Sequence, residues 1–229
     1  AQPFKSSGMM LTCRKDMGVN TTADLKGKTL GVWFYGNEYP FLSWMSRLGL
    51  KTDGSANGVT VLRQGWGVEP LTEGQAACVS TMSYNEYWVV RDAGYSPEQL
   101  TVFKYQSEGA ATLEDGLYVH EKNLSDAAFK DKMVRFVRAS MKGWKYAEAN
   151  PKEAAMIILD NDDAGVQTEK HQVRMMGEIA KLTAGSNGSL DPADYERTVK
   201  VLMSGDSDPV ITKKPSGAWT NEITNAALN

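Results

Sequence analysis

Aromatic and hydrogen-bonding side chains occur together in three short segments of the sequence. Residues 33–39 read Trp-Phe-Tyr-Gly-Asn-Glu-Tyr, residues 64–67 read Gln-Gly-Trp-Gly, and residues 83–87 read Ser-Tyr-Asn-Glu-Tyr. Each segment follows an apolar run typical of a buried strand and leads toward a stretch with helical spacing. Ligands of open parallel sheets bind beyond the carboxyl ends of the strands, where helix N-termini present unpaired N–H groups. We therefore expect the three segments to converge on one cleft for a flat, polar organic molecule.

The aromatic residues in and around these segments have two interpretations. Four of them border predicted strands or helices, where packing of the sheet against its helices is the favoured role: Trp33, Phe34, Trp44 and Trp88. Three others fall in predicted loops: Tyr39, Trp66 and Tyr84. A large ring in a loop has less core to fill, so packing and ligand contact stay equally open for these three.

Glu38 and Glu86 each lie just inside a predicted helix start. The helix macrodipole favours a carboxylate at that position whether or not a ligand binds. The alternative is that one or both accept hydrogen bonds from an amino group of the ligand. Asn37 and Asn85, which precede them, have the same two interpretations, capping of the helix or hydrogen bonding to the ligand.

The sequence contains no recognisable catalytic or metal-binding constellation. His120 and His171 lie in different segments, and neither belongs to a paired histidine motif of the kind that binds zinc. Residues 65–67 lack the third glycine and the acidic partner of a dinucleotide-binding loop. Glu114 and Asp115 are neighbours that would point to opposite faces of a strand, which disfavours an acid–base pair. We therefore expect no catalytic residue, no metal and no cofactor, and we predict that the protein is not an enzyme.

Two cysteines, Cys13 and Cys78, permit one internal disulfide. Whether they are bonded stays open, because sequence spacing does not give the Cα separation that a disulfide needs. No apolar run approaches the ~18 residues of a membrane helix, and residues 1–20 show no basic segment followed by an apolar one. We expect that any export signal has been removed or was never included.

Composition excludes several broad classes. The 229 residues are 41% hydrophobic and 23% charged, which is typical of globular proteins and unlike collagen-like or disordered chains. The 25 Lys and Arg residues against 28 Asp and Glu residues leave a net charge of −3, with no strongly basic half. A nucleic-acid partner is therefore not expected.

Apolar patterns in the first half alternate between strand-like and helix-like segments. Strands are expected at residues 9–13, 29–34, 59–62, 76–82 and 101–104, and helices at residues 37–49, 68–73 and 84–93. This alternation predicts right-handed crossovers and a parallel sheet that is covered on both faces. Residues 12–110 are therefore predicted to form one α/β lobe.

The second half is almost wholly helical in pattern after an apolar run at residues 116–120. Helices are expected at residues 129–149, 152–159, 168–182 and 192–202, with loops at residues 184–189 and 205–209. Helices with apolar faces need a sheet or other helices to cover, and few strands remain for them. We infer that a part of the protein against which these helices pack is missing from the chain.

Several motifs together resemble a known family. They are Asp-Leu-Lys-Gly-Lys at residues 24–28, the turn at residues 36–39, Glu-Gly-Gln-Ala-Ala-Cys at residues 73–78, and Leu-Glu-Asp-Gly-Leu-Tyr at residues 113–118. The chain resembles the periplasmic solute-binding components of ABC importers, in the branch that includes nitrate, sulfonate and thiamine-pyrimidine precursor binders. The resemblance runs through most of the chain, including residues 136–144 and 149–155.

The resemblance implies a two-lobe periplasmic-binding-protein type II fold of the α/β class. Lobe two would be complete at residues 12–110. Residues 1–11 and 111–229 would supply the crossing strands, at residues 2–12 and 112–120, and a mainly helical remainder of lobe one, whose N-terminal part is absent. The lobes would close over the solute by hinge motion.

The resemblance also implies a function. The turn at residues 36–39 matches a Gly-Glu-aromatic turn of the pyrimidine-binding branch, and Asn85 matches an asparagine after the third strand of that lobe. Loop position and resemblance together assign the ligand contacts to Trp33, Gly36, Asn37, Glu38, Tyr39, Trp66, Tyr84, Asn85, Glu86 and Asp115. The expected ligand is a small polar, planar heterocyclic solute similar to a thiamine-pyrimidine precursor, delivered in the periplasm to a membrane permease.

Two alternatives remain at this stage. One is a sulfonate- or nitrate-type binder, and the other is a pyridoxal-phosphate-dependent thiamine-pyrimidine synthase, an enzyme that shares the fold. The lysine and histidine of that enzyme would lie in the absent region, and its cysteine-rich patch is not visible here. Because lobe one is expected to be partial, we also expect the chain to expose apolar helix faces or to cover them by self-association.

Overall fold

The computed structural model describes residues 1–204 and 209–228, which form two compact units. Unit 1 consists of Ala1–Ser7, Leu113–Glu196 and Pro215–Asn229, and unit 2 consists of Gly8–Thr112 and Arg197–Lys214. The loop predicted at residues 205–209 lies, except for its last residue, outside the described residues. Each unit has its own buried clusters and is described by itself.

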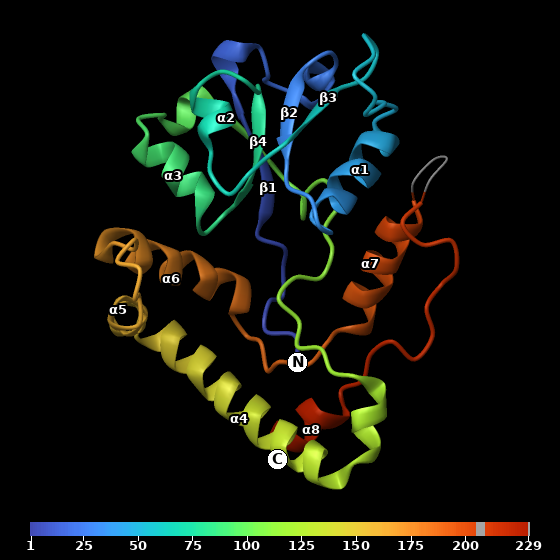
Figure 1. Cartoon of the computed structure of the whole chain (residues 1–229), viewed down its shortest axis with the longest axis vertical. Helices are drawn as coiled ribbons and strands as arrows, with labels where there is room; N and C mark the ends of the chain where they lie inside the picture. The colour runs from blue at the N-terminus through green and yellow to red at the C-terminus, as the bar shows by residue number, and fades with distance from the viewer. Residues whose placement is uncertain (205–208, 229) are drawn as a thin grey trace. The chain divides into compact units, whose positions relative to one another are not determined.

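Unit 2 is built on a five-stranded mixed sheet (Figure 1). The strands are β1 (Met9–Arg14), β2 (Thr29–Val32), β3 (Thr60–Arg63), β4 (Cys78–Met82) and β5 (Leu100–Lys104), in the order β3-β2-β4-β1-β5. Strand β2 pairs in parallel with β3 and β4, whereas β1 pairs antiparallel with both β4 and β5.

The expectation of a wholly parallel sheet was therefore wrong for β1. Residues 15–28 join the end of β1 to the start of β2 through two 3₁₀ turns, Lys15–Met17 and Thr22–Leu25. No helix crosses the sheet in this segment, so the chain leaves and re-enters at the same edge. β2 therefore begins at the edge of the sheet where β1 ends, and the two strands run in opposite directions.

Helices cover both faces of the unit 2 sheet, as Figure 1 shows. Helix α1 (Glu38–Arg47) packs on one face, where the buried cluster includes Phe41, Trp44 and Met45. The other face carries α2 (Glu69–Thr72) and α3 (Glu86–Asp92), with Leu71 and Val90 in a second cluster. A further 3₁₀ helix (Pro97–Gln99) leads into β5. The predicted strands and helices of residues 29–104 are confirmed, with bounds that differ by at most three residues.

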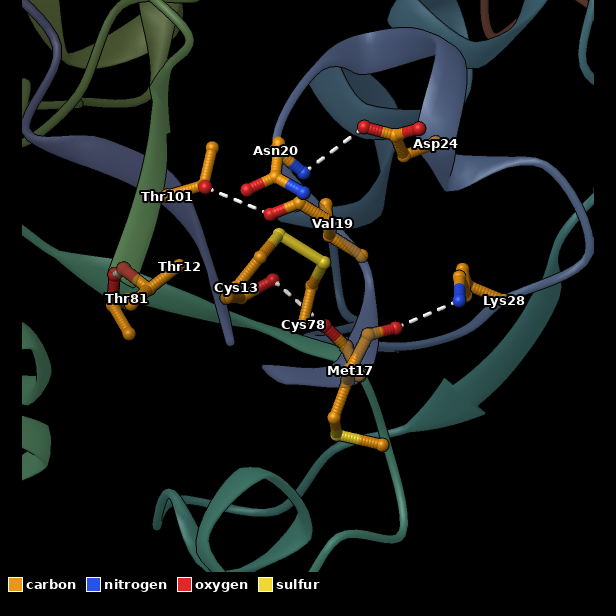
Figure 2. Close-up of a disulfide and its surroundings, with 12 residues drawn as sticks. Thr12, Cys13, Met17, Val19, Asn20, Asp24, Lys28, Cys78, Thr81 and Thr101 are labelled. Carbon is orange, nitrogen blue, oxygen red and sulfur yellow. Dashed lines mark hydrogen bonds between the residues drawn. A yellow bond between two sulfur atoms is a disulfide. The ribbon is translucent and has the colours of Figure 1, made fainter. Parts of the chain in front are cut away.

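A disulfide joins Cys13 to Cys78 inside this sheet (Figure 2). The two residues are direct partners in the antiparallel register of β1 and β4, and both are fully buried. Beside them, the Thr101 hydroxyl donates to the Val19 carbonyl at 2.8 Å. The sequence left this disulfide open, because the antiparallel pairing that makes the two cysteines neighbours cannot be read from their spacing.

Unit 1 contains α4 (Ala127–Ala149), α5 (Pro151–Asp160), α6 (Glu169–Thr183) and α8 (Glu222–Leu228), and α7 (Pro192–Met203) contributes to both units. A 3₁₀ helix (Glu121–Ser125) precedes α4. The side chains of Asp126 and Thr168 cap α4 and α6 by accepting from N–H groups of the first turn. Pro151 begins α5 at a position where its missing N–H costs nothing.

The predicted helices of the second half are confirmed, whereas two other features differ from expectation. Residues 111–120 form no strand; they make one backbone hydrogen bond toward the N-terminus, from Leu117 N–H to the Ala1 carbonyl. A single bond does not build a ladder, so the crossing strand predicted there is absent. Helix α8 was not predicted, because its short Ala- and Asn-rich segment carries little apolar periodicity. It is held by Arg138, which donates to the carbonyls of Ala226 and Ala227.

The helices of unit 1 bury little apolar surface. The described part of this unit contains no strand, and its two apolar clusters hold three buried residues each: Val137, Met141 and Ala227, then Ala154, Ala155 and Met176. Phe136 stays 53% exposed and Ile157 50% exposed. No helix within the described residues has both the length and the apolar character needed to cross a membrane.

Candidate functional site

Strand order places the candidate site at the carboxyl edge of β2, β3 and β4. The chain runs from β2 through α1 to β3 on one side, whereas β4 lies on the other side of β2. This reversal is a topological switch point, the place where open α/β sheets bind ligands. The three segments singled out in the sequence, residues 33–39, 64–67 and 83–87, all leave the sheet at this edge.

A buried glutamine holds the sheet together at the switch point. The side-chain amide of Gln64 accepts from Ser80 N–H at 2.8 Å and donates to the carbonyls of Ser80 and Gly67 at 3.0 and 3.1 Å. Gly31 makes room for it, since a Cβ there would lie 2.9 Å from Val79 and 3.3 Å from the Gln64 oxygen. The Gln64 side chain thus takes the place of a backbone group in the sheet and holds the loop at residues 64–67 against β4.

The loop from β2 to α1 adopts an unusual backbone. Tyr35 has a φ of 63° and Gly36 a φ of 108°, so two successive residues lie in the region that normally favours glycine. The Glu38 carboxylate accepts from Gly36 N–H at 2.7 Å, and the Asn37 amide donates to the Phe34 carbonyl at 3.2 Å. These side-chain hydrogen bonds of Asn37 and Glu38 therefore shape their own loop.

Trp33 joins two of the three loops. Its indole N–H donates to the Gly65 carbonyl at 2.9 Å, and its backbone N–H points to the Ser80 hydroxyl at 3.4 Å. The ring is half-buried and packs against the core, as the favoured interpretation held. Trp66, one residue beyond Gly65, is 96% exposed and fills no core. The structure thus decides against core packing for Trp66.

The third loop is organised by Glu86. Its carboxylate accepts from Met82 N–H at 2.9 Å and from the Asn85 amide at 2.7 Å. Burial raises the pKa of the Glu86 carboxyl, and these hydrogen bonds oppose the rise only in part. The Trp88 indole donates to the Ser83 carbonyl at 3.1 Å, closing the loop. Tyr84, between them, is half-buried.

Of the remaining predicted contacts, Tyr39 lies directly after its loop and Asp115 lies outside unit 2. Tyr39 is half-buried in the first turn of α1. Asp115 belongs to unit 1, where it has a φ of 56° and burial raises the pKa of its carboxyl. Its neighbour Glu114 accepts from the Ser7 hydroxyl. The structure of unit 2 therefore brings together nine of the ten predicted contacts on one edge, and the role of all ten stays a prediction.

Sequence reasoning missed the exposed ring of Tyr35 and the one cation of the described residues that stacks on aromatic rings at this edge. The Arg63 guanidinium lies 4.8 Å from the ring centre of Tyr35 and 5.1 Å from that of Phe34. Tyr35 is 92% exposed. Arg63 ends the edge strand β3, and the alternation Val61, Arg63 indicated the side of the sheet on which it would lie.

Comparison with protein families matches residues 1–154 to the family described as NMT1/THI5 like. The chain belongs to this family. Within the NMT1/THI5-like match lie the whole sheet of unit 2, the three loops, all of α4 and the first turn of α5. No curated protein matches the sequence.

Two solved structures were found to be similar to this NMT1/THI5-like chain, and the first shares its fold. A protein of Bordetella bronchiseptica RB50 superimposes with a TM-score of 0.72 and 20% identity, over 99% of this chain and 72% of the other. A chain from work on glutathione import via GshT and the cystine ABC importer TcyBC of Streptococcus mutans has a TM-score of 0.35 and 15% identity, over 45% and 42% of the two chains. The first likeness and the family together confirm the predicted α/β, periplasmic-binding-protein type of fold.

The groups of the NMT1/THI5-like chain at this edge are able to bind a ligand. Aromatic faces, amide groups and a guanidinium offer stacking and hydrogen bonds to a flat polar molecule. Across residues 1–204 and 209–228, no group of three His, Cys, Asp or Glu side chains is placed to hold a metal ion.

Proposed function

We propose that this chain is the extracytoplasmic solute-binding component of an ABC importer. It captures a small polar, planar heterocyclic solute, of the thiamine-pyrimidine precursor class, and presents it to a membrane permease. The observation that carries the proposal is the arrangement of the three loops at the switch point of the unit 2 sheet. Membership of the NMT1/THI5-like family supports the same function.

The ten predicted contacts receive roles within this proposal. Trp66 and Tyr39 offer ring faces to the flat solute, while Trp33 and Gly36 shape the wall between two loops. The second carboxylate oxygen of Glu38 and the amide of Asn85 hydrogen-bond to ring nitrogens or an amino group. Tyr84, Glu86, Asn37 and Asp115 complete the predicted set. A ligand held by several loops stabilises the conformation that the permease recognises.

The disulfide supports an extracytoplasmic location. Disulfides persist in oxidising compartments such as the bacterial periplasm and are rare in the cytosol. Cys13 and Cys78 are both fully buried in the central part of the sheet, so their bond is a structural feature of the folded state. We therefore assign the protein to the periplasm or an equivalent oxidising space.

We further propose that a β-sheet from residues outside this sequence covers the apolar helix faces of unit 1. Phe136 in α4 is 53% exposed and Ile157 in α5 is 50% exposed, while the described part of the unit has no strand. The Bordetella bronchiseptica structure is longer than this chain, which covers 72% of it. A second copy of the chain at the same faces is the competing outcome, and sedimentation of the purified chain separates the two.

Ligand-dependent stabilisation tests the function directly. Thermal unfolding is followed in the presence of 4-amino-5-hydroxymethyl-2-methylpyrimidine, of taurine, of a simple alkyl sulfonate or of nitrate, each added separately. A ligand at about 100 times its Kd stabilises by about 2.7 kcal/mol, which raises the midpoint by roughly 5–10 °C. A Trp66→Ala variant reduces the rise, whereas the exposed Val166→Ala variant retains it. If none of these solutes stabilises the protein, the proposal is wrong.

The synthase alternative is tested with the same protein. Incubation with pyridoxal phosphate and mass spectrometry after borohydride reduction would reveal a lysine adduct. An adduct, or turnover of pyridoxal phosphate, would show that the protein is an enzyme and not a binding protein.

A further inference from the structure

The Arg63 side chain at the end of β3 is the focus of this inference, which rests on the proposed function. Its guanidinium lies between two ring faces, 4.8 Å from the Tyr35 centroid and 5.1 Å from the Phe34 centroid. Val61, two residues earlier in the strand, packs against the cluster beneath α1, so Arg63 emerges on that same face. It therefore reaches the loop that joins β2 to α1.

The charge of Arg63 is not neutralised by the residues around it. Within the described ranges, no carboxylate lies at ion-pair distance from its guanidinium and no hydrogen bond engages it. The acidic group in the adjacent loop, Glu38, is turned onto Gly36 N–H. The guanidinium thus keeps its donors available for an external acceptor.

Arg14, in the same unit, also lies over an aromatic ring and serves as a comparison, because its charge is neutralised. Arg14 lies over the Tyr95 ring at 5.1 Å, but it also pairs with Asp16 at 2.8 Å and donates to the Leu71 carbonyl at 3.0 Å. Arg14 ends β1, which runs opposite to the other strands, so it lies at the amino edge of the sheet. The neutralised arginine is at the edge without candidate loops, and the uncompensated one is at the edge with them.

One of the two rings that contact Arg63 belongs to a residue with a strained backbone. Tyr35 has a φ of 63°, which is costly for a residue with a Cβ, and its side chain is 92% exposed. Because the ring is exposed, its packing does not offset the backbone strain. Trp66, in the loop tied to Trp33 through Gly65, exposes a third ring at the same edge.

We propose that Arg63 binds an anionic group carried by the planar solute. The group is a carboxylate, sulfonate or phosphate ester, which a guanidinium holds through two parallel hydrogen bonds. Phe34 and Tyr35 keep the guanidinium plane in place for that geometry, and the flat part of the solute contacts Tyr35 or Trp66. The solute is thereby an anionic heterocycle, and Arg63 is its specificity-determining residue.

Matched probe pairs test this assignment by calorimetry at low ionic strength. The pairs are 4-amino-5-hydroxymethyl-2-methylpyrimidine with its phosphate ester, nicotinamide with nicotinate, and benzenesulfonamide with benzenesulfonate. The native protein should bind the anionic member of at least one pair about tenfold more tightly or better. Arg63→Gln should remove that preference, Arg63→Lys should restore part of it, and Arg14→Gln should leave the ratio unchanged. Inorganic phosphate as competitor separates recognition of the anion alone from recognition of the whole solute.

The outcomes separate this inference from the proposed function. If neutral members bind and Arg63→Gln changes neither member of any pair, the chain is a solute-binding protein and the anion assignment is wrong. If no member of any pair binds, both proposals fail for these solutes. If Arg63→Gln leaves all probe affinities unchanged but abolishes binding to an acidic permease surface, the arginine serves the partner and not the solute.

Discussion

Units 1 and 2 solve the problem of burying apolar side chains in different ways. In unit 2 a sheet covered on both faces gives every strand a place in a buried cluster, and Trp44 packs against Phe103 and Tyr105 at centroid distances of 5.5 and 5.7 Å. In unit 1 the helices share two clusters of three buried residues each among the described residues. The comparison teaches that helices of this length need a covering layer, and that α4–α6 lack one among the described residues.

Removing a large core ring gives the largest expected contrast between the units. Trp44 is 2% exposed and Phe136 is 53% exposed. Trp44→Ala should destabilise unit 2 by about 3–5 kcal/mol, because it leaves a cavity, whereas Phe136→Ala should change stability by less than about 0.5 kcal/mol. Urea unfolding followed by circular dichroism measures both. Similar losses for the two variants would remove the distinction between the units.

Loss of the disulfide should also affect unit 2 selectively. The bond joins residues 65 positions apart, and its removal in Cys13→Ala/Cys78→Ala should cost about 2–4 kcal/mol by relaxing the unfolded chain. Hydrogen exchange should report faster opening of β1 and β4 and little change in α4. A reductant should destabilise the native protein to the same extent and leave the double variant unaffected. An unchanged midpoint in the double variant would contradict this expectation.

A helix cap offers a smaller effect confined to unit 1. The Asp126 carboxylate accepts from Ala128 N–H at 2.8 Å at the start of α4. Asp126→Ala should lower stability by about 1 kcal/mol, and Asp126→Asn should retain most of it because an amide oxygen also caps. Helical circular dichroism during thermal unfolding separates the two variants. Equal losses would show that the charge, and not the hydrogen bond, stabilises the helix.

Glu86 makes the stability of unit 2 depend on pH. Burial raises the pKa of its carboxyl in the folded state, so its protonated form is favoured by folding. The contribution is fully present below the pKa of the unfolded state and is lost as pH rises through the folded pKa. Glu86→Gln should flatten this part of the stability profile in the acidic range. A profile identical to that of the native protein would mean that Glu86 titrates normally.

The smallest effect on stability is expected at the exposed face of α5. Ile157 is 50% exposed, so Ile157→Lys should change the free energy of unfolding by less than about 0.5 kcal/mol. The same variant should weaken self-association of the chain, which analytical ultracentrifugation measures, because a charge disfavours apolar contact. Asn161→Lys, at an exposed position just after the helix, serves as a control for added charge. A loss above about 1 kcal/mol would show that this face is already covered.

The alternation of strands and helices in residues 29–104 was predictable because each element carries its own apolar period and its own turn residues. Asn37, Pro40 and Gly49 bracket α1 in the sequence as they do in the structure. The direction of β1 was not predictable, since it depends on how residues 15–28 return to the sheet. The pairing of Cys13 with Cys78 depends on that direction and was hidden for the same reason.

The candidate site was predictable in place and less so in composition. Strand ends and loop residues located the edge, and Trp66 lies exposed there as a loop position favours. Arg63 was missed because a single arginine after an apolar strand has no distinctive spacing. Its significance arises from stacking on Phe34 and Tyr35, which depends on the left-handed backbone of Tyr35. Such a conformation at a non-glycine residue is not written in the local sequence.

The position of β1 also has a consequence for biosynthesis. Among the five strands of its sheet β1 comes first in the chain, yet it lies between β4 and β5, both of which come later. Its two edges therefore stay unsatisfied until residue Lys104 has left the ribosome, and sheets assembled from such distant partners form slowly. Cys13 and Cys78 therefore become neighbours, and able to form their disulfide, only after β4 has been made and has paired with β1.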